Sequence, residues 1–245
     1  LNTDSGFTKA YAAVLKEDSI QLTIRQISFE RIIEAYEFMC GFFSIADDKI
    51  YELGWMSLSI NDSLFVTWYS KNVYIIGCKQ SDNRRIERVM RKAMLSTNKL
   101  KNLPNFLQVF PSEDVIQNSC RASTLPFLQQ DHFIQTYYAD YESKGNISRI
   151  FIIPVEKDSI FIQFQKFRDF WKTRGLLVEL DTPVELPHFV AQDVFLGRMI
   201  CVIYQDYIIG IMNYHSLERA KEYLDRIRKN LKEYPVLPEH TIQSQ

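Results

Sequence analysis

The sequence predicts an α+β fold made of two similar units, each an antiparallel sheet with helices on one face. Short strand-like runs alternate with helical patterns, and the order of these patterns in the first half of the chain recurs in the second half. The closest local match is between 72–77 and 206–210, where a hairpin strand ends in Ile-Ile-Gly before a capped helix. We interpret this recurrence as an internal duplication. The alternative is chance similarity between two α+β stretches.

The first unit is predicted over residues 8–101, after a flexible N-terminal segment at 1–7. Ser28 is the predicted N-cap of its first helix, because serine favours that position. Asn72 suits a left-handed turn position in the predicted hairpin. The predicted elements are strands at 9–15 and 20–27, a helix through 29–40, a hairpin at 64–69 and 73–78, and a second helix that starts at Ser81 or Asp82.

The second unit is predicted over 131–232 and is followed by a loose tail at 233–245. An ordered crossover at 102–130 joins the units, because this segment is too apolar for a flexible linker. The predicted elements are strands at 134–141, 147–155 and 189–195, a helix that starts at Asp158-Ser159, a hairpin at 199–204 and 207–212, and a last helix capped by Ser216.

Composition and motifs exclude several classes of function. The 29 Lys and Arg residues nearly balance the 30 Asp and Glu residues, a net charge of −1, so we expect no nucleic acid partner. The sequence holds no Gly-x-Ser-x-Gly elbow, no phosphate-binding loop and no dinucleotide fingerprint. His188, Asp193 and His215 form the only grouping considered for a metal, and no two histidines have helical ligand spacing. We therefore predict no catalytic residue, no cofactor and no metal ligand.

The cysteines are predicted to be free thiols, because their spacings match no zinc or redox pair. A disulfide is the alternative if the protein is exported, since the number of cysteines is even. The four residues are Cys40, Cys78, Cys120 and Cys201.

Two surfaces are candidate contact sites. A basic stripe on the predicted helix after residue 82 would attract phosphate, an anionic glycan or an acidic partner, and a solvated helix face is the alternative. Its residues are Arg84, Arg88, Arg91 and Lys92. Tyr137 and Tyr141 share one face of a predicted strand and could present an aromatic contact surface, whereas ordinary sheet packing is the alternative.

Three stretches carry a resemblance to a known family: Ala35–Ser44, with an aromatic Ala-Tyr and Phe-Ser theme, the paired strands at 65–74, and the connector at 109–119. They resemble the bacterial domain-of-unknown-function family 6599, whose members are mainly exported or lipid-anchored. Asp114 and Asn118 stand where the family connector has glycines, and both residue types can still turn a chain. Gln117 replaces its second proline. The resemblance implies an extracytoplasmic location and brings no catalytic residues.

The small polar residues after Leu1 are typical of a tether that follows a processed signal or lipid anchor, and an arbitrary chain boundary is the alternative. A membrane would be involved only through such an anchor. We favour a non-catalytic exported domain that binds a protein partner or small ligand in a cleft between the two units. The alternative is an enzyme whose site is assembled by the fold without a linear motif.

Overall fold

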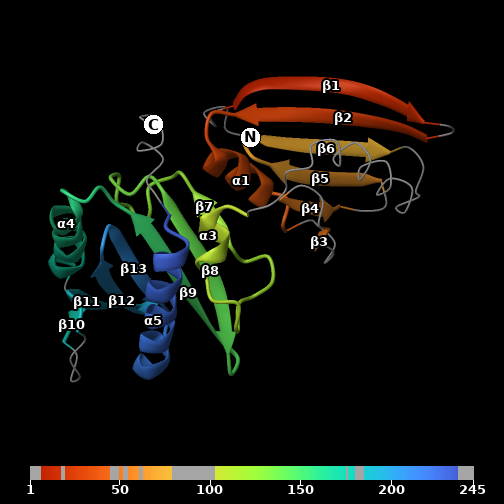
Figure 1. The fold of residues 1–245 in the computed structure, drawn as a ribbon. Helices are drawn as coiled ribbons and strands as arrows, with labels where there is room; N and C mark the ends of the chain where they lie inside the picture. Colours follow the sequence, from red (N-terminus) through yellow and green to blue (C-terminus); the bar gives the residue numbers. More distant parts are fainter. Residues whose placement is uncertain are drawn as a thin grey trace. The chain divides into compact units, whose positions relative to one another are not determined.

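The chain divides into two compact units, Leu1–Leu103 and Pro104–Gln245, each of which we describe by itself (Figure 1). A computed structural model describes residues 7–17, 20–44, 50–51, 55–60, 63–78, 103–174, 176–179 and 185–236. Each unit contains an antiparallel sheet and at least one helix, which confirms the predicted α+β class. Residues 104–130, expected to lie in a separate crossover, belong to the second unit.

The first unit is a six-stranded sheet with the order β1-β2-β6-β5-β4-β3, and α1 packs against its central strands. Tyr36 of α1 lies with its ring centroid 4.8 Å from that of Trp68, and both side chains are fully buried. The elements are β1 (Phe7–Glu17), β2 (Ile20–Phe29), α1 (Ile32–Cys40), β3 (Ile50–Tyr51), β4 (Met56–Ser59), β5 (Leu64–Tyr69) and β6 (Asn72–Cys78).

The start of α1 differs from the prediction, because β2 continues through Ser28 and the helix is capped at Arg31. The Glu34 carboxylate accepts the backbone N–H of Arg31 at 3.1 Å and its guanidinium at 2.8 Å. Ser28 instead donates its hydroxyl to the Asn72 side-chain oxygen at 2.7 Å across the sheet. The prediction of Ser28 as the N-cap is therefore wrong, since its hydroxyl serves a cross-strand pair.

The hairpin turn of the first unit also differs in detail. Ser70 has the left-handed backbone, with φ 54°, whereas Asn72 is already in β6 and pairs with Ser28. The indole N–H of Trp68 donates to the Ser70 carbonyl at 2.8 Å. The Asn72 side chain is hydrogen-bonded to its neighbours on β2. The positive φ is instead at Ser70, the first residue of a two-residue turn.

The second unit is a seven-stranded antiparallel sheet with the order β10-β11-β12-β13-β9-β8-β7. Ser159 stands at the N-cap of α4, and the Ser216 hydroxyl accepts the Arg219 N–H at 3.3 Å, so both predicted helix starts are confirmed. The elements are α3 (Asn105–Gln108), β7 (Arg121–Ser123), β8 (Thr136–Ser143), β9 (Asn146–Pro154), α4 (Ile160–Thr173), β10 (Leu177–Val178), β11 (His188–Asp193), β12 (Gly197–Tyr204), β13 (Tyr207–Met212) and α5 (Leu217–Glu233).

Helices cover both faces of this sheet, which corrects the expectation of helices on one face. Phe164 and Phe167 of α4 share a buried cluster with Phe151 and other side chains of one sheet face. Tyr223 of α5 lies 4.9 Å, between ring centroids, from Tyr141, which is on the opposite face. Every residue of β13 is buried. Strands covered on both faces read as continuous apolar runs, as β12 and β13 do.

The two sheets share a strand order when their strands are counted along each unit. The order β1-β2-β6-β5-β4-β3 corresponds to β8-β9-β13-β12-β11-β10, and β7 is an addition beside β8. The helices α1 and α4 each follow the second strand of this series. This agreement is what a duplication requires, and the duplication itself stays a prediction.

Two further expectations concern thiols and membranes. Cys40, Cys120 and Cys201 are not in disulfide bonds, as predicted, and the side chain of Cys78 lies outside the described residues. Within the ranges given above, no helix is both long and apolar enough to cross a membrane.

Candidate functional site

The predicted contact residues have different outcomes. The basic stripe, Arg84, Arg88, Arg91 and Lys92, lies outside the described residues. Tyr137 and Tyr141 are buried, with 2% and 1% of their surfaces exposed, so an exposed tyrosine face is wrong. Tyr137 stacks on Phe106 with ring centroids 4.7 Å apart, and the Tyr141 hydroxyl donates to the Pro111 carbonyl at 2.9 Å. The segment predicted as a crossover folds over this face of the sheet and covers both rings.

The histidine grouping considered for a metal is not assembled. His215 lines a pocket at the start of α5, whereas His188 lines a different pocket beside α4. Across the described part of the chain, no three His, Cys, Asp or Glu side chains gather as a metal site would require.

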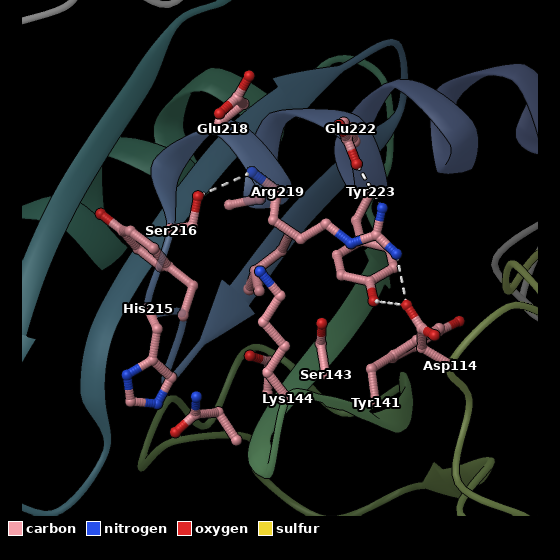
Figure 2. A pocket seen from close by; sticks show the side chains of 15 residues that line it. Asp114, Tyr141, Ser143, Lys144, His215, Ser216, Glu218, Arg219, Glu222 and Tyr223 are labelled. Atoms are coloured by element: carbon pink, nitrogen blue, oxygen red, sulfur yellow. Dashed lines mark hydrogen bonds and ion pairs between the residues drawn. The ribbon is translucent and has the colours of Figure 1, made fainter.

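The pocket at the start of α5 is the candidate site, and we call it the hairpin–helix pocket (Figure 2). It has a volume of about 470 Å³. The end of the β8–β9 hairpin, the first turns of α5 and the segment at Asp114 form its walls. Its polar and charged lining includes Asp114, Ser143, Lys144, Asn146, His215, Glu218, Arg219, Glu222 and Tyr223.

Local backbone chemistry positions the hairpin against α5. Lys144 and Gly145 both have positive φ, 52° and 78°, which is the geometry that a two-residue hairpin turn requires. The Asn213 side-chain amide donates to the Ile147 carbonyl at 2.7 Å, and the Ser148 hydroxyl donates to the Asn213 carbonyl at 3.1 Å. These bonds tie the hairpin to the connection that leads into α5.

A network around Asp114 fixes the opposite wall of the pocket. Arg219 forms ion pairs with Asp114 and with Glu222, and its guanidinium lies 4.8 Å from the centre of the Tyr223 ring. The Tyr223 hydroxyl donates to the Asp114 carboxylate at 3.0 Å (Figure 2). The Asp114 carbonyl accepts the backbone N–H of Glu142 at 2.8 Å, which anchors this residue beside β8.

The network sets the protonation of its members. Hydrogen bonds from Arg219 and then from Tyr223 hold the pKa of Asp114 below its ordinary value. Burial, and then the hydrogen bond to Asp114, raises the pKa of Tyr223, and burial also raises the pKa of Tyr141 and of Tyr214. At neutral pH this wall therefore presents one guanidinium paired with two carboxylates, together with neutral phenols.

The hairpin contributes the polar groups that remain available. Ser143 and Lys144 have no side-chain hydrogen bond or ion pair with any residue that the structure describes. Figure 2 shows the Lys144 side chain extending from the hairpin toward α5, with Ser143 beside it. The pocket thus combines a wall in which one guanidinium is shared by two carboxylates with an ammonium and a hydroxyl that no described residue binds.

The sequence reasoning missed this pocket because its members are scattered from Asp114 to Tyr223 and share no linear motif. One signal was present. Asp114 and Asn118 stand at glycine positions of the resembled connector, and both adopt left-handed backbone with φ 59°. A connector that turns at a carboxylate was therefore predictable, although the pairing of that carboxylate with Arg219 was not.

Comparisons with known proteins add little to this picture. No protein-family model matches the sequence, and a search of curated proteins finds no similar sequence. A solved structure titled "Methanococcus jannaschii TBP" aligns with 93% of this chain and 99% of its own, at 13% identity and a TM-score of 0.14. That score is too low to support any argument about fold or function. Membership of family 6599 stays a prediction.

Proposed function

We propose that the chain is a non-catalytic, extracytoplasmic binding domain, and that its hairpin–helix pocket takes a small ligand or partner segment that carries one carboxylate. The observation that carries the proposal is the division of charged groups in the pocket. Arg219 pairs with both Asp114 and Glu222, whereas Lys144 has no ion-pair partner among the described residues. The Lys144 ammonium therefore remains available to an incoming anion.

The size and charge of the pocket define the class of ligand. A volume of about 470 Å³ falls in the range of small-molecule sites. The hydroxyl of Ser143 and the amide of Asn146 supply hydrogen-bonding groups beside Lys144. Glu218 and Glu222 also line the pocket, and their charges disfavour ligands with several negative groups. A singly charged carboxylate with polar substituents fits this set best.

The protonation of the pocket favours binding over acid–base catalysis. A general base works best with a pKa near the operating pH. The Asp114 pKa is lowered by its partners, and the tyrosine pKa values are raised, so these groups do not exchange protons readily near neutral pH. An enzyme with a fold-assembled site remains the second candidate. Turnover of a carboxylate ligand that is abolished by one substitution in the pocket would favour it.

The test compares small carboxylates, including short peptides with a free C-terminus, with their neutral amides by isothermal titration calorimetry. The wild-type chain should bind a carboxylate at least about tenfold more tightly than its amide, since a charge-assisted hydrogen bond strengthens the contact. Lys144→Met should abolish this difference. Lys157→Met, at an exposed lysine before α4, is the matched control and should preserve it. Equal affinity of wild type and Lys144→Met for every carboxylate would contradict the proposal.

Location and the remaining contact predictions need separate tests. Protease treatment of intact source cells should degrade the protein if it is displayed outside the cytoplasm, while a cytoplasmic marker survives. Protection of both proteins in intact cells, with degradation of both after lysis, would contradict surface display. Binding between the two units and anion binding by the basic stripe stay predictions.

A further inference from the structure

Strand β1 stands at one end of the first sheet, with only β2 beside it among the described residues. It is 11 residues long, and the side chains described for it are exposed. Its apolar members include Phe7, Tyr11 and Val14, with 50%, 58% and 53% of their surfaces exposed. A long, exposed, apolar edge strand offers a row of backbone donors and acceptors to another strand.

The second unit shows what occupies the same position in its own sheet. Strand β8 corresponds to β1 in the shared strand order, and its outer edge pairs with β7. The Ile116 N–H also donates to the Asp140 carbonyl of β8 at 2.8 Å, and Glu142 donates to Asp114 at 2.8 Å. The topology thus accepts a further strand at this edge. In the first unit, no described residue supplies one.

We propose that β1 pairs antiparallel with β1 of a second copy of this chain, so that two six-stranded sheets continue across a twofold axis. This pairing would give hydrogen-bond partners to the outward-facing backbone N–H and C=O groups of both strands. Tyr11 and Val14 point from opposite faces of a strand, so the same pairing would cover apolar surface on both faces.

The charged residues of β1 favour a second copy of the same strand as the partner, and they favour one register of the pairing. If Ala13 faces its own copy, Lys9 of each strand stands opposite Glu17 of the other, which gives two pairs of opposite charge. In the same register Val14 stands opposite Ala12. Centring the pairing on Ala12 instead sets Lys9 opposite Leu15 and Glu17 opposite Phe7, so neither pair of opposite charge forms. The strand is therefore complementary to itself in one particular alignment.

A cysteine placed on the twofold axis tests that alignment. Directly opposite residues of antiparallel strands have Cα atoms about 4.5–5.5 Å apart, which lies within the range that a disulfide spans. Ala13→Cys should therefore form a disulfide-linked dimer on oxidation, seen by non-reducing denaturing electrophoresis. Ala12→Cys, the matched control, should not, because it stands opposite Val14 rather than itself. Equal cross-linking of both variants, or of neither, would overturn the register.

Oligomeric state and charge reversal test the pairing itself. The wild-type chain should be a dimer by light scattering coupled to size exclusion. Lys9→Glu should weaken dimerisation about tenfold or more, since both attractive pairs become repulsive, and the double variant Lys9→Glu with Glu17→Lys should restore it. Circular dichroism of each variant establishes that it is folded. A monomeric wild type, or a dimer indifferent to Lys9→Glu and to Tyr11→Lys, would overturn the proposal. A monomer that captures a strand of another protein would identify a different occupant and also overturn it.

Discussion

The hydroxyl of Tyr223 donates a 3.0 Å hydrogen bond to the carboxylate of Asp114, a residue 109 positions earlier in the chain. Asp114 lies in the connector before β8, and Tyr223 lies in α5. The bond joins two elements that no local pattern in the sequence connects. Together with Arg219 it builds one wall of the hairpin–helix pocket, so the connector is part of the candidate site as well as of the fold.

The first prediction concerns the pH dependence that Asp114 produces. Its pKa is lowered in the folded chain, so its stabilising effect is fully present above its ordinary pKa near 3.8 and is lost as pH falls through the folded value. Asp114→Asn should lower the melting temperature at pH 7. The gap between variant and wild type should narrow as the pH approaches 3, measured by thermal unfolding across that range.

Asp158→Asn is the control for this prediction, because it removes an exposed aspartate that forms no ion pair with any described residue. Its melting temperature should follow that of the wild type across the whole range. If the difference in melting temperature between Asp114→Asn and the wild type stays constant down to pH 3, the charge of this carboxylate does not stabilise the fold.

The second prediction concerns His132, which should make the stability of the fold depend on pH in a higher pH range than Asp114 does. Partial desolvation of this exposed side chain, and then the nearby charge of Lys166, lowers the pKa of its imidazole in the folded chain below the ordinary value of 6.5. The unfolded chain therefore takes up the proton first as pH falls, and stability should decrease between pH 7 and pH 5. His132→Gln should flatten this part of the stability curve in denaturant titrations. A slope unchanged by His132→Gln would contradict the assignment.

The aromatic side chains of α4 divide into core and surface, which predicts unequal effects of the same substitution. Phe167 is fully buried and packs edge-on against Phe133 and Phe189, with ring centroids 5.2 and 5.4 Å away. Phe167→Ala should cost about 3–5 kcal/mol of unfolding free energy. Phe161 is 67% exposed, so Phe161→Ala should change stability by about 0.5 kcal/mol or less. Comparable losses for both variants would contradict the packing described.

The sequence predicted the elements better than their ends. Strand alternation and helical spacing are local, so the hairpins and both capped helices of the second unit were predictable. Ser28 was misassigned as a cap because its hydroxyl could serve either a helix end or a neighbouring strand, and only the pairing with Asn72 decides between them. The unbroken apolar runs of β12 and β13 indicate a sheet that is covered on both faces. The prediction of helices on one face did not take these runs into account.

The candidate site was far less predictable than the fold. Tyr137 and Tyr141 were correctly placed on one strand face, but their burial depends on Phe106 and Pro111, which precede the strand by about thirty residues. Alternation along a strand separates two faces without saying which one is covered. Long-range pairs such as Asp114 with Arg219 have no sequence spacing, so they become visible only in the folded chain.

Two glycines that each follow an Ile-Ile pair in the second strand of a hairpin, Gly77 in β6 and Gly210 in β13, give a last prediction in which one substitution has opposite signs. A Cβ built on Gly210 would lie 2.1 Å from the ring of Phe151, which packs directly on this backbone. Gly210→Ala should therefore displace the ring and cost about 1–3 kcal/mol of unfolding free energy, as overpacking does.

A Cβ built on Gly77 meets no atom within 4 Å, and its backbone has no positive φ. Gly77→Ala should therefore stabilise the first unit by about 0.5–1 kcal/mol, because alanine loses less backbone entropy than glycine in a strand. Denaturant titration of the whole chain, analysed unit by unit, measures both changes. Losses of similar size at the two glycines would show that the ring contact is not what requires glycine at position 210. A loss of unfolding free energy at Gly210 and a gain at Gly77 would show that the two Ile-Ile-Gly runs differ in packing. In β13 the glycine makes room for a ring, whereas in β6 the position next to the glycine is unfilled.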